Sequence, residues 1–422
     1  MIGGRSGASP ILLADRKAGT LMEDLYARAQ ALKDDLVADR RWLHEHPEIG
    51  FDLPQTRAYV QRRLAEEGIQ TDEVAGGVVG LIGSPDAGPC FMLRADMDAL
   101  PMAEQTGLPF AATNGCMHAC GHDGHTAMLI AAARLLKERE DDLPGCVKIM
   151  FQADEEGTAP GEICGNEAMI RAGVLENPPV VAASAVHLVP VDFARGEIAT
   201  RKGCAFSSID DIDIAVRGRG GHGSQPWQTV DPIPIACRIL LGIQNLAARE
   251  TDTADAAVIT FGRIEGGSAA NIIPDSVHML GTLRTVAEET RRHLQQRIAE
   301  IAENIARAFG GEADVRFLRG VPPVHNDPAL TEELASYASA LIGRPITELE
   351  APVAGSDDMS VISQAVPTTY FLLGCGTPAE GVTHPVHSPH AVFDESVLAE
   401  GAALLATVAF QWLAARNTHP SR

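Results

Sequence analysis

The sequence predicts an α/β fold with a mostly parallel sheet and helices on both faces, plus an inserted ferredoxin-like α+β domain. Short apolar runs such as 147–151 and 180–186 alternate with helical patterns, and strands of this composition are typical of parallel sheets buried on both faces. Between residues 206 and 318 the predicted order becomes strand, helix, strand, strand, helix, strand, which is that of a ferredoxin-like unit. We therefore expect one domain built from residues 1–205 and 319–422, interrupted by a second domain at 206–318.

Local patterns place the individual elements. Leucines at helical spacing predict a helix over 21–46, which Pro47 ends, and Pro54 suits the first turn of a second helix that runs to Gly68. Further helices are expected directly after 117–125 as far as 138, and at 166–172, 231–248, 288–309, 330–342 and 395–415. The expected strands are 78–82, 91–93, 147–151, 180–186, 209–216, 257–261, 277–284, 313–318 and 368–373.

Composition and charge narrow the classes of function. The chain has 422 residues, with 34 Lys plus Arg against 56 Asp plus Glu, so its formal net charge is −22. Such a surface repels phosphate backbones, so no nucleic acid partner is expected. The longest apolar runs are too short to span a bilayer, so no membrane association is expected either. The eight cysteines are scattered through a long chain, as in reduced proteins, and we expect a cytoplasmic location.

The segment Met117–His125 holds three histidines and a cysteine within nine residues, directly before a long apolar helical run. Thiolate and imidazole are ligands for borderline-soft divalent metals such as Zn²⁺ or Mn²⁺, and the glycines allow a tight turn into the helix. One alternative is a histidine-rich helix start without a metal. Another is a structural zinc site closed locally by Cys116, Cys120, His122 and His125.

Polar side chains that suit a metal also follow other predicted strands. The residues delivered at the carboxyl ends of these strands are Asp98, Glu155, Glu156 and His187. In open α/β sheets ligands bind beyond the carboxyl ends of the strands, so these side chains should converge at one edge. A hydrolytic metal centre also needs a base that is not a ligand. Successive residues of an extended chain point in opposite directions, so one glutamate can bind metal while its neighbour faces water. The alternative is a solvated acidic turn.

Short motifs lie along nearly the whole chain, and they are Arg41–Pro47 with Glu48–Phe51, Leu93–Pro101, Met117–His125, Glu155–Gly157, His187–Pro190, Gly218–His222, Asn271–Asp275, Gly281–Arg284 and His387–Pro389. Together they resemble the aminoacylase/carboxypeptidase metallopeptidases, in particular the amidohydrolase branch with hippurate hydrolases and indole-acetyl-amino-acid hydrolases. The resemblance implies a zinc-peptidase-like catalytic domain that binds metal. It also implies that the inserted domain serves as a lid and in dimerisation.

The resemblance further implies roles for individual residues. The implied ligands, for one or two divalent ions of Mn or Zn with Co or Ni as alternatives, are Cys120, His122, Glu156, His187 and His387. His122 is the implied bridging ligand. Glu155 is the implied general base, which activates water and then protonates the leaving amine, and Asp98 is implied to orient a ligand.

Residues of the inserted domain are implied to complete the site. His222 resembles a residue that reaches the active site of a neighbouring subunit and stabilises the oxyanion, so a homodimer or homotetramer is expected through this domain. Asn271 and Arg284 resemble the groups that hold the substrate carboxylate. From the residues alone, a loop asparagine and a strand-edge ion pair are equal alternatives for these two.

The expected activity is hydrolysis of the amide bond of a small-molecule N-acyl or N-aroyl amino acid by a metal-activated water, with Glu155 as general base. A dipeptidase or carboxypeptidase acting at the same site is the alternative. The chain departs from the family pattern around the site, namely in the longer stretch 158–164, in Trp227 in place of a histidine, in Asp357 and Met359 in place of glutamate and phenylalanine, and in Ala391 in place of an aromatic. These positions bear on substrate choice, and the sequence leaves the acyl group, the amino acid and the metal open.

Overall fold

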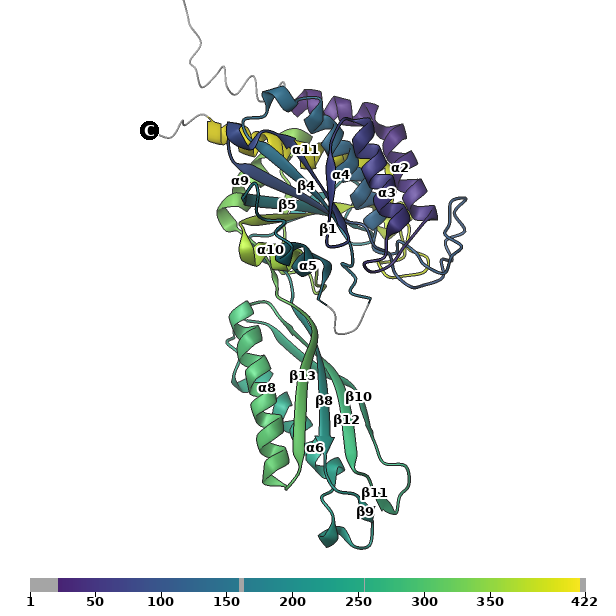
Figure 1. Ribbon diagram of the computed structural model, residues 1–422, viewed down its shortest axis with the longest axis vertical. Helices are drawn as coiled ribbons and strands as arrows, with labels where there is room; N and C mark the ends of the chain where they lie inside the picture. The colour runs from purple at the N-terminus through teal and green to yellow at the C-terminus, as the bar shows by residue number, and fades with distance from the viewer. Residues whose placement is uncertain (1–21, 159–162, 254, 418–422) are drawn as a thin grey trace, which may run out of the picture.

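The central feature of the computed structural model is a sheet of eight strands (Figure 1). The structure describes residues 22–158, 163–253 and 255–417. The four inner strands run parallel, in the order β4 (Cys146–Gln152), β3 (Cys90–Asp96), β5 (Val180–Val189) and β16 (Thr368–Gly374). Their residues are almost all buried, which explains their apolar sequences. The predicted α/β sheet, mostly parallel, is therefore confirmed.

Shorter strands extend the sheet on both sides. Beyond β4 lie the antiparallel strands β2 (Gly77–Gly83) and β1 (Thr71–Val74), and beyond β16 lie β6 (Ile198–Thr200) and β15 (Thr347–Glu348). The sequence did not predict β1, β6 or β15, because strands of 4, 3 and 2 residues are too short to show an alternating pattern. It also ended β5 at residue 186, whereas the strand continues to Val189 and contains His187.

Helices cover both faces of this sheet (Figure 1). One face carries α2 (Lys33–Glu45), α3 (Pro54–Glu66), α4 (His122–Lys137), α9 (Pro328–Ile342) and α11 (Leu398–Asn417), whose apolar side chains share one core cluster. The other face carries α5 (Gly165–Arg171) and α10 (Met359–Ala365) over a second cluster. Residues 22–31 are helical too, and a turn at Leu32 divides the single helix predicted for 21–46.

The C-terminal helix is longer and more apolar than expected. Within the described residues, Glu395–Arg416 has the length and composition of a membrane-crossing helix, with a mean hydropathy of 1.6. This finding corrects the expectation that no apolar run reaches that length. Of its most apolar window, 89% is buried inside the fold, where α11 packs against α4 and α9. The composition is thus that of a helix surrounded by a protein core.

A second sheet of four antiparallel strands has its own core cluster. Its strands lie in the order β10 (Ala257–Gly266), β12 (Ser276–Thr285), β8 (Ile209–Arg217) and β13 (Glu312–Val321). The helices α6 (Pro232–Gln244) and α8 (Glu288–Ala308) pack on one of its faces (Figure 1). This is the predicted ferredoxin-like arrangement, while the boundaries at 206 and 318 stay a prediction. The short helix α7 (Leu246–Arg249) follows α6, where one helix was expected over 231–248.

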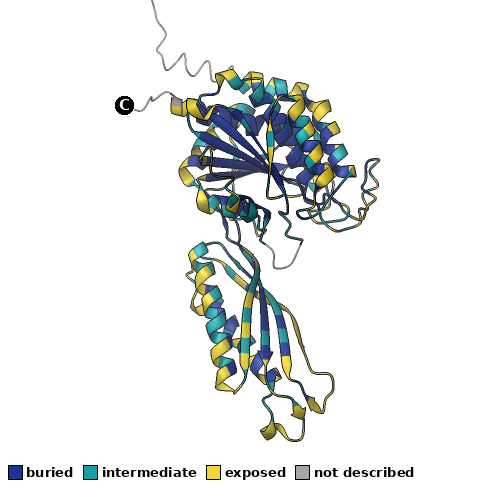
Figure 2. Ribbon diagram, viewed as in Figure 1, coloured by how far each residue is buried: buried dark blue, intermediate teal, exposed yellow. Residues whose placement is uncertain are grey.

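Two short ribbons complete the chain. One pairs β7 (Gly203–Phe206) with β14 (Val324–Asn326), where the chain passes between the two sheets. The other pairs β9 (Gly221–His222) with β11 (Ile272–Ile273) at the end of the four-stranded sheet far from the eight-stranded one. Figure 2 shows the strands of the larger sheet buried and the tip around β9 and β11 exposed.

Candidate active site

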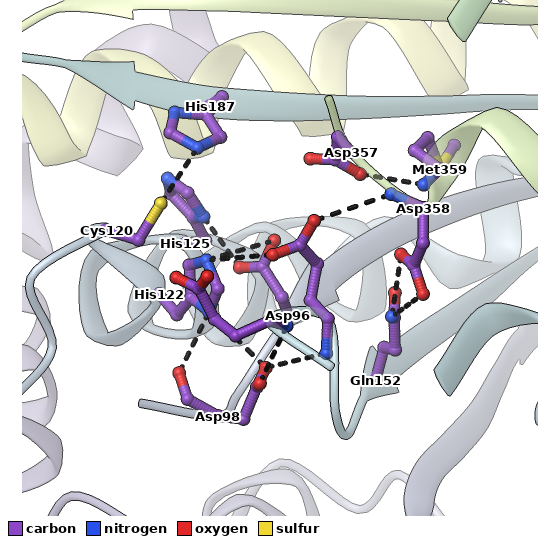
Figure 3. Close-up of polar contacts among 12 residues, drawn as sticks. Asp96, Asp98, Cys120, His122, His125, Gln152, His187, Asp357, Asp358 and Met359 are labelled. Carbon is purple, nitrogen blue, oxygen red and sulfur yellow. Dashed lines mark hydrogen bonds and ion pairs between the residues drawn. The ribbon is translucent and has the colours of Figure 1, made fainter. Parts of the chain in front are cut away.

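The predicted metal ligands come together at the carboxyl ends of the inner strands. Their donor atoms form two groups within 4.8 Å, namely Cys120 with His122 and His187, and Cys120 with Glu156 and His387. A third group joins His122 and Glu156 to the predicted base Glu155. Cys120 Sγ lies 3.5 Å from His187 Nε2 (Figure 3). His387 Nε2 lies 3.2 Å from Glu156 Oε1. All five predicted ligands thus share one site, although their role as ligands stays a prediction.

A tight turn brings Cys120 and His122 to this site. Gly121, between them, has φ 92°, and a Cβ atom at Gly121 would lie 2.9 Å from Cε1 of Phe393. Only glycine fits both the left-handed backbone and the close packing. The helix α4 begins at His122 and continues as a buried apolar helix, so His122 stands on a rigid element and Cys120 lies directly before it.

Asp98 connects the start of α4 with the glutamate pair. His122 Nδ1 donates to the backbone oxygen of Asp98 at 2.9 Å. The carboxylate of Asp98 accepts hydrogen bonds from the backbone N–H groups of Glu155, at 3.1 Å, and of Glu156, at 3.0 Å. Asp98 therefore contacts the ligand candidate His122, whose Nδ1 also lies 3.4 Å from Asp98 Oδ1, and in addition holds the bend that carries Glu155 and Glu156. The predicted alternation along an extended chain is wrong, because β4 ends at Gln152 and the glutamates lie in a bend.

The other nitrogen of His122 indicates where a cation fits. His122 Nε2 is buried and has no hydrogen-bond partner among the residues that the structure describes. It lies 3.8 Å from Glu155 Oε2 and 3.8 Å from Asp96 Oδ2. An unpaired buried nitrogen facing two carboxylates is costly without a cation between them. The donor set of imidazole, thiolate and carboxylate therefore fits a divalent metal ion.

Both ring nitrogens of His125 have partners within the protein. Its Nδ1 lies 2.7 Å from Asp96 Oδ1, and its Nε2 accepts a hydrogen bond from the backbone N–H of Leu188 at 2.8 Å. Both nitrogens are thus engaged, and Leu188 follows the ligand candidate His187 in β5. The alternative of a local structural zinc site is not supported, because His125 has no free nitrogen and Cys116 joins no cluster among the described residues.

Burial sets the protonation of the site. It lowers the pKa of His187 to about 3, so this imidazole is neutral and offers a lone pair to a metal. Burial raises the pKa of Cys120 well above its ordinary value, so the thiol needs a metal to become a thiolate. Burial also raises the pKa of Glu155 well above its ordinary value, and nearby carboxylates raise it further. A carboxyl group of this kind suits proton transfer near neutral pH.

A buried arginine that the sequence analysis did not single out holds the acidic side of the site together. Arg94 Nη1 lies 2.7 Å from Asp96 Oδ2, and its Nη2 lies 3.1 Å from Asp358 Oδ1 and 3.4 Å from Asp357 Oδ1. The backbone N–H of Asp358 in turn donates to Glu155 Oε1 at 3.4 Å (Figure 3). An arginine within an apolar strand indicates acidic partners nearby, because a buried charge requires partners.

A cavity of about 990 Å³ opens beside these groups. It is lined by Cys120, Glu155, Glu156, His187 and His387 on one side and by Arg284 of β12 on another. Apolar side chains line much of the rest, among them Phe193, Phe206, Leu349, Val353 and Leu372. Of the longer stretch 158–164, residues 159–162 lie outside the described part of the chain, and Ile163 and Cys164 line the cavity.

The structure does not bring His222 and Asn271 to this cavity. Both are exposed at the tip of the four-stranded sheet, where β9 pairs with β11 (Figure 1). His222 Nδ1 is 2.9 Å from Ser224 Oγ, and neither His222 nor Asn271 lines the cavity. Within one chain, Arg284 is the predicted residue of the second sheet that reaches the site.

Comparison with known proteins gives one consistent family. Residues 92–411 match the family described as peptidase family M20/M25/M40. Thermostable carboxypeptidase 1 from Saccharolobus solfataricus is 36% identical over 397 residues, which is 93% of this chain and 99% of that protein. N-acetylcysteine deacetylase from Bacillus subtilis is 35% identical, over 91% of this chain and 96% of that protein. An IAA-amino acid hydrolase from Arabidopsis thaliana is 36% identical, over 90% of this chain and 86% of that protein.

The fold is shared with solved structures. The crystal structure of a dinuclear metal-binding peptidase of the M20 family from Bacillus subtilis superposes with a TM-score of 0.76. The two chains are 33% identical, over 91% of this chain and 99% of that one. The shared fold therefore extends over most of the chain.

Proposed function

The chain belongs to peptidase family M20/M25/M40 and is a metal-dependent hydrolase, and we propose that it cleaves the amide bond of N-acyl amino acids. One observation carries the proposal: a partly buried carboxyl group, Glu155, lies beside the clustered ligand candidates in a cavity that Arg284 also lines. Relatives named for N-acetylcysteine deacetylation and IAA-amino acid hydrolysis support it.

Cys120, His122, Glu156, His187 and His387 would hold one or two metal ions, of which we propose Mn or Zn. Bound metal ions supply Lewis acidity that activates water and the amide carbonyl. Glu155 accepts the proton of the attacking water and passes it to the leaving nitrogen, for which its raised pKa is suited. Asp98 keeps Glu155 in place through the backbone of the bend.

Substrate groups have matching partners in the cavity. Arg284 has one guanidinium N–H bonded to the backbone oxygen of Ala354 at 3.1 Å, which leaves further donors for a carboxylate. The apolar wall with Phe193 and Phe206 suits an acyl group. We further propose a homodimer or homotetramer in which the tip with His222 and Asn271 completes the site of a neighbouring subunit, because both residues are exposed and lie outside their own cavity.

A second candidate is carboxypeptidase or dipeptidase activity at the same site, favoured by the 36% identity to a carboxypeptidase. A substrate panel separates the two functions. The metal-loaded protein is given N-acetyl and N-benzoyl amino acids and free-amine dipeptides with the same C-terminal residue, and the released amino acid is quantified. Faster release from the N-acyl compounds is expected. Release from dipeptides alone would replace the proposal with the second candidate.

A further inference from the structure

More acidic side chains line the cavity beside the candidate metal centre than Arg284 alone can neutralise. Among the described residues that line it, Arg284 is the one arginine, and none is a lysine. Some lining acids have cationic partners: Asp357 and Asp358 contact Arg94, and Glu167 contacts Arg171. Two others, Asp192 and Asp211, form no ion pair or side-chain hydrogen bond with any residue in the described ranges. Asp192 is exposed, whereas Asp211 is partly buried.

Asp211 lies next to the group expected to hold the substrate carboxylate. It is paired in register with Thr282 of β12, and Arg284 follows two residues later on the same strand. Side chains two residues apart point to the same face of a sheet, so Asp211 and Arg284 are diagonal neighbours. Both line the cavity, and neither forms an ion pair with the other.

The other acids of β8 show that this lack of a partner is particular to Asp211. Asp210 is bound by Arg291 at 2.7 Å, and Asp213 is bound by Arg316 at 2.9 Å. Asp210 and Asp213 thus each have an arginine partner from a neighbouring element. Asp211, which lines the cavity, has no such partner among the described residues.

We propose that Asp211 selects N-acyl amino acids whose side chain is cationic, such as derivatives of lysine. The inference rests on the proposed function, because it assigns the α-carboxylate to Arg284. The Cα atoms of diagonal neighbours lie about 7–8 Å apart, so the carboxylate and the ammonium group of one extended lysine derivative can reach Arg284 and Asp211 together. A substrate with a neutral side chain leaves Asp211 without a partner, and the carboxylate of an acidic substrate side chain is repelled by Asp211. The acyl group of the substrate packs against the apolar wall of the cavity, where it requires no charged partner.

The test compares kcat/KM for Nα-benzoyl derivatives of lysine, norleucine and glutamate with the metal-loaded protein. Norleucine has the carbon chain of lysine without its charge, and all three substrates carry the same acyl group. We expect lysine to exceed norleucine by about fivefold, the effect of one partly exposed ion pair, with glutamate slowest. High salt should reduce the ratio, because it screens this interaction.

Two variants locate the effect. Asp211→Asn should bring the ratio of lysine to norleucine close to one. Asp314→Asn, which removes an exposed acid of β13 outside the cavity lining, should keep the wild-type ratio. Because the readout is a ratio, a partly unfolded preparation does not change it.

The outcomes separate this inference from the proposed function. Equal rates for the lysine and norleucine derivatives in the wild-type protein would overturn the inference while the N-acyl activity stands. A lysine preference that persists in Asp211→Asn would overturn the role of Asp211. If none of the three derivatives is cleaved while free-amine dipeptides are, the proposed function is wrong, and the inference that rests on it is wrong as well.

Discussion

Replacing Arg94 with methionine should destabilise the protein strongly. The Arg94 side chain is 1% exposed, and it lies within ion-pair distance of Asp96, Asp357 and Asp358, whose side chains are also buried. Its Nε also donates to Gln152 Oε1 at 2.7 Å. Removing one member of a buried ion pair costs about 3–5 kcal/mol, because the remaining charge stays buried without a partner. We expect Arg94→Met to lose at least this free energy of unfolding.

Urea unfolding measures the loss, with Arg28→Met as the matched control. Arg28 pairs with Glu138 at 2.7 Å, but the two side chains are 39% and 35% exposed. Such a pair contributes about 0.2–1 kcal/mol to stability. Arg94→Met should therefore lose several times more free energy of unfolding than Arg28→Met, while the m value stays unchanged. If Arg94→Met costs no more than Arg28→Met, Arg94 does not hold the acidic network together and our account of its role is wrong.

Three further predictions concern catalysis, pH and assembly. Glu155→Gln should lower turnover by at least about 10²-fold with metal content unchanged, whereas Glu156→Gln should lose metal; exchanged phenotypes would reverse the two roles. Burial lowers the pKa of His44, but bonds to Asp123 and Glu104 outweigh it and raise the pKa. The stability that His44 contributes is therefore complete below its ordinary pKa of about 6.5 and is lost as pH rises through the raised value. His44→Gln should accordingly cost more unfolding free energy at pH 5.5 than at pH 9, and an equal cost at both would refute this. Finally, mixing inactive His222→Ala and Glu155→Gln chains should restore part of the activity if His222 acts in a neighbouring subunit; mixed oligomers without activity would exclude that.

The sequence predicted that these site residues lie close together, because each of them is next to a helix or strand that can be recognised from its apolar pattern. Cys120 and His122 precede an apolar helix, and Glu155, Glu156 and His187 lie at or near the carboxyl ends of apolar strands. The topology of a parallel sheet then brings these ends to one edge. No detailed knowledge of packing was needed for this step.

Contacts between distant parts of the chain could not be predicted in the same way. Arg94 and Asp358 are separated by 264 positions, and neither belongs to a pattern that indicates the other. The bend that carries the two glutamates is held by hydrogen bonds from their backbone N–H groups to Asp98, and they do not lie on an extended strand. The location of His222 at an exposed tip also depends on the tertiary arrangement, because its motif indicates a glycine-rich turn but not its distance from the site.

The most direct test of the central claim is the activity of the protein with and without metal. We predict that chelation abolishes cleavage of an N-acyl amino acid and that Mn²⁺, Zn²⁺ or Co²⁺ restores it in proportion to the metal bound, measured by elemental analysis of the same samples. A His122→Ala variant, which lacks the buried nitrogen facing Asp96 and Glu155, should bind less metal under the same conditions. Full activity in wild-type protein shown to be free of metal would contradict the account.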